Sequence, residues 1–235
     1  MTNENKGLDL TGLGEVAKSI PPEVYVQTTG TVLSTFNKLV APITETTDGL
    51  GRYIRQKFDN MVDVEKAVAT YTLENAVLKA QKKSTALGQV ISPPIHYKSF
   101  VKTLDEASKE TDPLLHEMWE NLLAEQLVSH TFHPHFVEVL SHFSPSEARL
   151  LVSLRSKDEV TVHSGGYISY NDDSFTHWIK NGDENKLNEW NYSCILLHEF
   201  RFVGLLAVDK ERYSNGVTIL HRTSSGDSFL KAVSP

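Results

Sequence analysis

The sequence has a single cysteine, Cys194, among its 235 residues. One cysteine cannot close a disulfide within the chain, and it cannot supply the set of thiolates that holds a structural zinc ion. We therefore expect Cys194 to be a small buried apolar residue in a protein of the reducing cytoplasm.

Long apolar runs are also lacking. The most apolar window, SCILLHEFRFVGLLAV at residues 193–208, is interrupted by His198, Glu199 and Arg201, which disfavours a membrane-crossing helix there. The polar start, MTNENKGLDL, lacks the basic and apolar regions of a secretory signal. These features predict a cytoplasmic protein without a membrane span.

The chain has no excess of basic residues. It carries 23 basic and 30 acidic side chains, which gives a net charge of −7. Proteins that bind nucleic acid regardless of its sequence need positive charge to neutralise phosphates. We therefore do not expect general nucleic-acid binding.

Signature motifs of nucleotide binding and hydrolysis are absent: the sequence has no G-x-x-x-x-G-K-[ST] loop, no G-x-S-x-G elbow and no G-x-G-x-x-G turn. HEMWE (residues 116–120) and HEFRF (residues 198–202) begin like the zinc motif H-E-x-x-H, but each lacks the second histidine. The acidic residues Glu117, Glu120 and Glu125 fit a solvated helix surface. We predict no catalytic residues, no cofactor and no bound metal, and the sequence favours a protein that is not an enzyme.

Helical patterning covers most of the chain. Apolar residues recur at helical spacing, one continuous helix is expected at about residues 48–81, and Asp112 is placed to cap another. We predict a mainly α protein in three parts. Residues 1–27 form a polar segment with a short amphipathic helix, residues 28–143 form an α-helical domain, and residues 144–235 form a small α+β module.

The α+β module is predicted to be winged-helix-like from the order of its elements. EVTVHSGGYISY alternates like a hairpin, LNEWNYSCILLHEF follows as a helix, and VGLLAV and VTILHRT form a two-stranded wing before a final helix. The helix that would face DNA carries Asn188, Glu189, Glu199 and Arg201, in which acids cancel bases. We favour a structural or protein-binding module, and a nucleic-acid-binding regulator is the alternative.

Three histidines, His130, His133 and His135, occur within the stretch HTFHPHF. Histidine is the commonest metal ligand and a frequent acid–base catalyst. A residue before proline avoids the helical conformation, so we expect His133 and Pro134 to form the turn between two helices. Phe136, on the apolar face of the second helix, is expected to lie in the core.

The polar face of that second helix carries His135, Glu138 and His142, if the helix runs over residues 134–143. His135 and His142 lie about 10 Å apart along the axis, so one ion cannot bind both through imidazole alone. We favour a solvated face at a helix junction. The alternative is a metal-dependent hydrolase or nuclease that uses the His130–His142 cluster.

The next stretch, FSPSEARLL, predicts the start of a helix. Ser144 is placed as the N-cap and Pro145 as the first helical residue. Glu147, three positions after the cap, is placed to complete a capping box.

DPLLHEMWENLLAEQL, HPHFVEVLSHFSPSEARLL, VGLLAV and the terminal RTSSGDSFLKAV together resemble the Abi-alpha family of bacterial proteins linked to abortive infection. The resemblance runs from about residue 42 to the C-terminus and is strongest over residues 112–151. It implies a role in anti-phage defence, and it carries over no catalytic residue, because none is established for the family. The positions that match the family pattern are Leu115, Leu122, Leu123, His133, Pro134, Phe136, Pro145, Glu147, Ala148, Gly204 and Phe229.

We therefore expect a defence protein that works by macromolecular contact, as a phage sensor or as an effector. Its partner would be a phage protein, a host component or a second copy of the chain, and binding would shift the population of its states. Contact of residues 8–40 with a membrane surface is a weaker alternative, because Lys38 is the one basic residue on the polar face of the second helix predicted there. The candidate contact residues are Asp172, Asp173 and Trp178 in a polar loop, and His135, Glu138 and His142.

Overall fold

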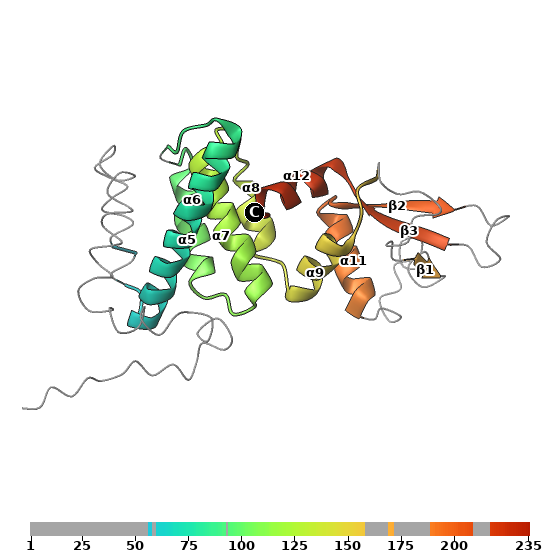
Figure 1. The fold of residues 1–235 in the computed structure, drawn as a ribbon. Helices are drawn as coiled ribbons and strands as arrows, with labels where there is room; N and C mark the ends of the chain where they lie inside the picture. Colours follow the sequence, from blue (N-terminus) through green and yellow to red (C-terminus); the bar gives the residue numbers. More distant parts are fainter. Residues whose placement is uncertain (1–55, 58–59, 93, 158–168, 172–188, 209–216) are drawn as a thin grey trace, which may run out of the picture. The chain divides into compact units, whose positions relative to one another are not determined.

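The computed structural model describes residues 56–57, 60–92, 94–157, 169–171, 189–208 and 217–235. These residues are mostly helical, with a small antiparallel sheet near the C-terminus (Figure 1), which confirms the predicted mainly α fold with an α+β C-terminal part. The elements are α5 (Asp63–Leu87), α6 (Tyr97–Ala107), α7 (Pro113–Val128), α8 (His135–Leu140), α9 (Pro145–Ser153), β1 (Ser169–Asn171), α11 (Glu189–Glu199), β2 (Val203–Val208), β3 (Val217–Arg222) and α12 (Ser224–Ala232).

The chain divides into two compact units. The helical unit comprises the described residues up to Ser141 together with Val233–Pro235, and the C-terminal unit is His142–Ala232. Among the described residues, no helix is long and apolar enough to cross a membrane.

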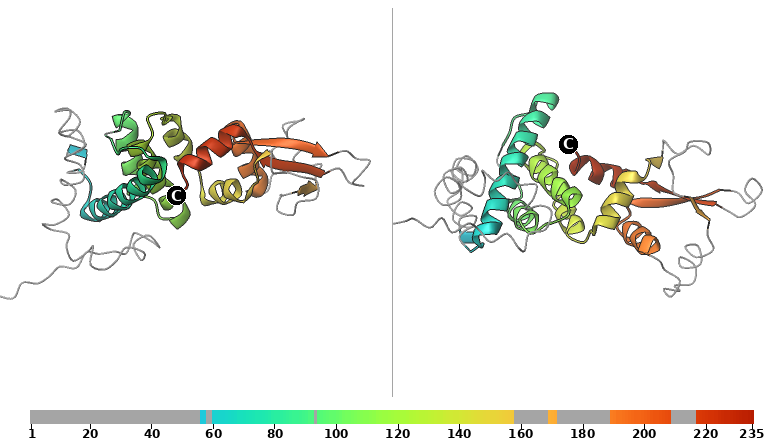
Figure 2. Two further views of the ribbon diagram at one scale, coloured as in Figure 1. Left: turned by 45° about the horizontal axis from the view of Figure 1, so that its top comes forward. Right: turned by 60° about the horizontal axis from the view of Figure 1, so that its bottom comes forward.

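The core of the helical unit lies between α5, α6 and α7, which pack side by side (Figure 2). Leu73 of α5, Phe100 of α6, and Leu123 and Leu127 of α7 are buried in this core. Each side chain of this size stabilises the folded state by about 1.5–3 kcal/mol when it leaves water. The three helices therefore depend on one another more than on their own propensities.

The bounds of α5 differ from those of the helix predicted at residues 48–81. Within the described residues the helix starts at Asp63, because Val62 has extended backbone angles (φ −71°, ψ 158°). It continues past residue 81 and ends at Gly88, whose left-handed φ of 63° lets its N–H bond the Ser84 carbonyl oxygen.

α7 starts as its sequence predicts. The Asp112 side chain accepts hydrogen bonds from the backbone N–H groups of Leu114 and Leu115 at 3.0 and 3.2 Å, and Pro113 is the first helical residue. The cap satisfies donors that have no partner in the first turn of a helix, so local sequence is enough to place this end of α7.

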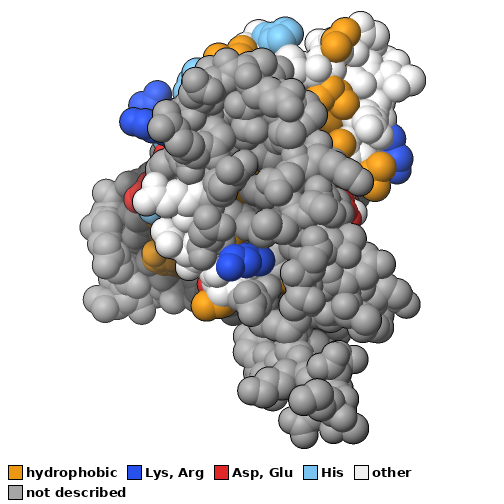
Figure 3. Space-filling view, turned by 90° about the vertical axis from the view of Figure 1, so that its left-hand side faces the viewer, with side chains coloured by type: hydrophobic (Ala, Val, Ile, Leu, Met, Phe, Trp, Pro, Cys, Tyr) orange, Lys and Arg blue, Asp and Glu red, His pale blue; other side chains and the backbone are white. Residues whose placement is uncertain are grey.

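The end of α5 and the connection to α6 expose several large apolar side chains within nine residues. They are Leu87, Val90, Ile91 and Ile95, and we name them the apolar segment. The connection is fixed to α7, because the Ser92 N–H donates to the Leu127 carbonyl oxygen at 3.0 Å. Figure 3 shows hydrophobic and histidine side chains close together at the top of the view, the end of the helical unit at which α5 finishes.

The C-terminal unit contains a three-stranded antiparallel sheet in the order β1–β3–β2. β2 pairs with β3 from Val203 opposite Arg222 to Val208 opposite Val217. β1 pairs with the first half of β3, and most of the hairpin predicted at residues 159–170 lies outside the described residues. The observed order α9, α11, β2, β3, α12 matches the prediction, and the winged-helix likeness rests on that order.

Aromatic side chains fill the core of the C-terminal unit. Phe143, Phe200, Phe202 and Phe229 form one cluster, in which the rings of Phe202 and Phe229 stack 4.7 Å apart. α12 approaches this cluster at Gly226, where a Cβ atom would lie 2.2 Å from the Phe202 carbonyl oxygen. That distance excludes every side chain, so glycine is required at this contact.

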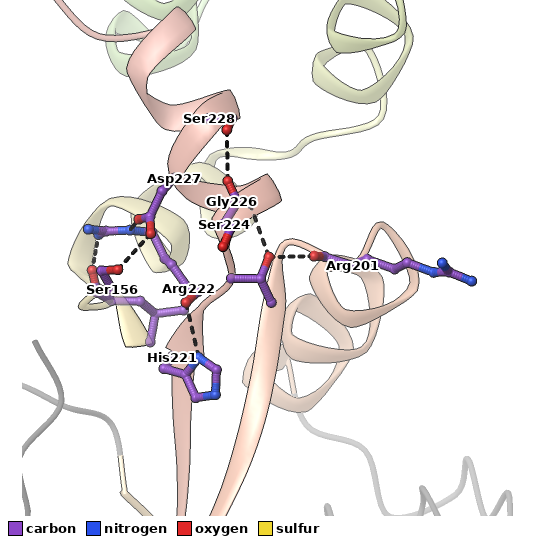
Figure 4. Close-up of polar contacts among 10 residues, drawn as sticks. Ser156, Arg201, His221, Arg222, Ser224, Gly226, Asp227 and Ser228 are labelled. Atoms are coloured by element: carbon purple, nitrogen blue, oxygen red, sulfur yellow. Dashed lines mark hydrogen bonds and ion pairs between the residues drawn. The ribbon is translucent and has the colours of Figure 1, made fainter. Parts of the chain in front are cut away.

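A polar clasp joins the start of α12 to the segment after α9. Asp227 accepts hydrogen bonds from Ser156 Oγ at 2.6 Å and Arg222 Nε at 2.7 Å (Figure 4), and Arg222 Nη1 donates to the Leu154 carbonyl oxygen. Burial alone would raise the pKa of Asp227, but these hydrogen bonds and the charges of Arg222 and His221 hold it below its ordinary value. The terminal motif RTSSGDSF is thus a packing and capping element.

Candidate functional site

The histidine-rich stretch forms the junction between α7 and α8. His130 is exposed in the turn after α7, and His133 and His135 are also exposed. His133 and Pro134 lie in the connection, where His133 Nδ1 accepts a hydrogen bond from the His135 N–H at 3.2 Å. His130 and His133 thus lie in the connection between the two helices, and the His133 ring makes a hydrogen bond to the backbone of that connection.

The length and the buried face of α8 differ from the prediction. The helix was expected over residues 134–143 with Phe136 in the core, but it ends at Leu140 and buries Val137, Val139 and Leu140. Phe136 is only half-buried, with its ring 6.4 Å from that of Phe132. A six-residue helix is too short for its own periodicity to decide which face is buried, so packing decides it.

The polar residues expected on one helix face do not form a metal site. Glu138 pairs with Lys102 of α6 at 2.5 Å. His142 falls in the C-terminal unit, where its ring stacks 6.0 Å from that of Phe200. Across the described ranges, which include His130 to His142, no group of three His, Cys, Asp or Glu residues is placed to hold a metal ion.

The capping box at the start of α9 forms as predicted. Ser144 accepts from the Ser146 N–H at 3.2 Å, Pro145 is the first helical residue, and Glu147 accepts from the Ser144 N–H at 2.7 Å. Glu147 is also buried and accepts from Ser193 Oγ of α11 at 2.5 Å. This carboxylate therefore fixes one helix end and joins two helices.

The residues considered for DNA reading are only partly within the described ranges. Asn188 lies outside the described residues, and Glu189 and Glu199 stand at opposite ends of α11. Arg201 lies in the turn after α11 with a left-handed φ of 59°, and its carbonyl oxygen accepts from Thr223 Oγ1 at 2.6 Å. Its side chain points away from the clasp (Figure 4).

The other predicted contact surface cannot be placed. Asp172, Asp173 and Trp178 lie outside the described residues, as do residues 8–40.

A buried polar cluster between α5 and α7 was not predicted. Glu120 of α7, expected on a solvated surface, is only 6% exposed. Its carboxylate accepts from Asn75 Nδ2 at 2.7 Å and from Lys79 Nζ at 2.8 Å, both on α5. The expectation is wrong because α5 buries Glu120. The two α5 residues that contact it, Asn75 and Lys79, precede it in the sequence by 45 and 41 residues.

His116 is the second buried member of this cluster. Its Nε2 lies 3.2 Å from Thr72 Oγ1 and 3.6 Å from Glu120 Oε1. The Thr72 hydroxyl donates its hydrogen to the Val68 carbonyl oxygen at 2.8 Å, so it accepts from His116, which assigns a hydrogen to Nε2. Within the described part of the chain, the buried Nδ1 atom has no hydrogen-bond partner.

Glu120 is held in its ionised form. Burial alone would raise its pKa, but hydrogen bonds from His116, Lys79 and Asn75 and the charge of Lys79 together bring the pKa below its ordinary value. A charged carboxylate inside a protein is tolerated only with such donors around it.

A pocket of about 190 Å³ opens beside this cluster. Its lining consists of Tyr71, Asn75, Lys79, Pro113, His116, Glu117 and Glu120. The sequence signal that could have found it is a matched spacing: His116 and Glu120 are four apart on α7, and Asn75 and Lys79 are four apart on α5.

The chain matches a known protein family over most of its length. Residues 62–233 match the model of the Abi_alpha family, described as abortive infection alpha. No curated protein and no solved structure matches the chain. The matched range takes in both units, from the residue before α5 to the residue after α12.

Proposed function

We propose that this chain, which belongs to the abortive infection alpha family, acts in anti-phage defence by binding a protein partner through its apolar segment. The observation that carries the proposal is the exposure of Leu87, Val90, Ile91 and Ile95 over nine residues at the end of α5 and in the connection to α6. Single exposed apolar residues are ordinary on a protein surface, but a concentration of them is typical of interaction sites.

Burial of these side chains would stabilise a complex with a partner. Burying one side chain of this size contributes about 1.5–3 kcal/mol, so several together outweigh part of the entropy lost on association. Val90 is 79% exposed and Ile95 is 55% exposed, so most of their apolar surface is free to be covered. The Ser92–Leu127 hydrogen bond holds the connection in place, which reduces the ordering cost of binding.

The partner would be a phage protein, a host component or a second copy of the chain. A partner that binds one conformational or assembly state more tightly shifts the population toward that state. In this mechanism the chain senses infection or acts on its target by contact, and no catalytic step is needed.

The proposal is tested by the paired substitution Val90→Asp with Ile95→Asp. A carboxylate at either position stays solvated in the free protein but would have to lose water at the interface, so binding is lost while the fold is kept. We expect the plating efficiency of phage on cells with the double variant to rise to that on cells without the chain, with thermal melting unchanged.

Val152→Asp is the matched control, because Val152 is an exposed apolar residue of the C-terminal unit. Cells with this variant should keep the protection that the wild-type chain gives. Full protection by a Val90→Asp, Ile95→Asp chain that melts like the wild type would contradict the proposal.

A further inference from the structure

The pocket between α5 and α7 is short of positive charge. Its lining includes two carboxylates, Glu117 and Glu120, and one ammonium group, Lys79. Lys79 Nζ lies 2.8 Å from Glu120 but 3.9 Å from Glu117, so it neutralises the buried carboxylate first. Glu117 has a half-exposed side chain and faces the pocket with its charge poorly balanced.

The polar groups of the pocket that can still take part in hydrogen bonds include several acceptors. Asn75 and Lys79 each direct an N–H to Glu120, and the Lys79 ammonium also lies 3.9 Å from Glu117, whereas the buried His116 Nδ1 of the lining has no hydrogen-bond partner within the described part of the chain. An ionised carboxylate offers about four acceptor sites and no donor, so Glu117 can take several further hydrogen bonds and give none. A ligand that fits this pattern must bring donors, and a positive charge on it would also supply the missing counter-charge.

The size and walls of the pocket narrow the class of ligand further. Its volume of about 190 Å³ lies below the about 300–1,000 Å³ of pockets that take drug-sized molecules, so it suits a group the size of one side chain. Tyr71 and Pro113 supply apolar walls, and the face of an aromatic ring attracts cations.

From these observations we propose that the pocket binds an ammonium or guanidinium group, paired with the Glu117 carboxylate and next to Tyr71. The group could belong to a small free amine or to a lysine or arginine side chain of a protein. Both sources present the same chemistry to the pocket, and the experiment separates them. The pocket is distinct from the apolar segment, so either site can fail its test without the other.

The test uses the full-length chain and a pair of isosteric probes. N-acetyl-arginine amide carries the guanidinium group, and N-acetyl-citrulline amide has the same shape without the charge. We expect amide chemical shifts of residues in α5 and α7 to change on titration with the arginine probe and not with the citrulline probe. Agmatine, a free amine that also carries a guanidinium group, forms the third arm: tighter binding of agmatine indicates a small-molecule ligand, and tighter binding of the blocked arginine indicates a protein side chain.

Glu117→Gln removes the unbalanced carboxylate with little risk to the fold, because 52% of its side chain is exposed. It should weaken binding of the arginine probe about tenfold to a hundredfold, the loss expected for one charge-assisted hydrogen bond. Glu125→Gln is the matched control: Glu125 is also on α7 and pairs with α5, through Lys83 at 3.3 Å, but it does not line the pocket.

The control variant should bind the probe as the wild type does. Equal responses to the arginine and citrulline probes would overturn the proposal. So would equal loss of binding in the two variants, because that would show a general effect of charge rather than a site.

Discussion

Glu120 is a charged residue inside a helical core, and its neighbours explain why that is tolerated. Asn75 and Lys79 donate to its two oxygens from α5, and His116 lies one turn earlier on its own helix. These donors favour the ionised carboxylate more than burial disfavours it, which is why its pKa is lowered.

The lowered pKa makes the stability of the helical unit depend on pH in a defined direction. Because the pKa of Glu120 is lower in the folded state, its ionised form stabilises the fold above the ordinary value of 4.5, and the contribution is lost as pH falls through the lower folded-state value. Glu120→Gln removes this titrating group and leaves Lys79 with a weaker partner. At pH 7 we expect the variant to be about 1–3 kcal/mol less stable, the usual cost of breaking a hydrogen bond of a buried charged group.

Urea unfolding at a series of pH values measures this effect. The difference in free energy of unfolding between the wild type and Glu120→Gln should shrink as the pH is lowered from 4.5 through the lower folded-state pKa of Glu120. All other acidic groups are common to both proteins, so their titration cancels in the difference. A difference that stays constant over this range would show that Glu120 does not titrate as described.

Features of single residues that depend on nearby sequence could be predicted, and features that depend on packing against distant segments could not. Ser144 and Glu147 form the predicted capping box, and Cys194 is buried as expected, because each depends on nearby sequence or on residue type. The expectation of a solvated Glu120 was wrong, and the burial of His116 was not predicted, because both depend on α5 and no local pattern on α7 encodes that contact. The requirement for glycine at position 226 could not be predicted either, because it arises from the close approach of the Phe202 backbone.

At the scale of elements, helices with strong end signals were predicted best. α7 begins at its Asp112 cap and α9 at its Ser144 cap, each followed by proline. α8 has no such start signal, because its N-cap residue, Pro134, has no side chain that can accept a hydrogen bond. Its predicted length was wrong. Local capping chemistry therefore carries more information than periodicity over a few residues.

The capping box at α9 gives a prediction of stability for a single element. Ser144→Ala removes the side chain that accepts from Ser146 and leaves an N–H group at the helix start without its partner. We expect the free energy of unfolding to fall by about 1 kcal/mol. Chemical denaturation followed by far-ultraviolet circular dichroism measures the change.

Ser153→Ala at the other end of α9 is the control for this prediction. Ser153 Oγ donates to the Leu150 carbonyl oxygen within the same helix, a bond that caps no orphan donor. Its loss should change stability by less than about 0.5 kcal/mol. Equal effects of the two substitutions would mean that the cap contributes nothing specific.

At the scale of the whole molecule, the mainly α fold with an α+β C-terminal part could be predicted, because helical periodicity and the change to alternating strands are both visible in the sequence. The family could also be recognised, and the family match spans both units. The apolar segment could not be found this way, since the exposure of Leu87, Val90, Ile91 and Ile95 depends on which surfaces α6 and α7 leave uncovered.

The central claim, that the apolar segment is where a protein partner binds, is tested most directly by site-specific photo-crosslinking in cells. A benzophenone amino acid is placed at Val90 in the full-length chain and, as a control, at Val152, which is also an exposed apolar residue. After phage infection and irradiation, we predict one defined crosslinked product from position 90 that is absent from position 152. Equal or no products from the two positions, in a chain that still protects its host, would contradict the claim.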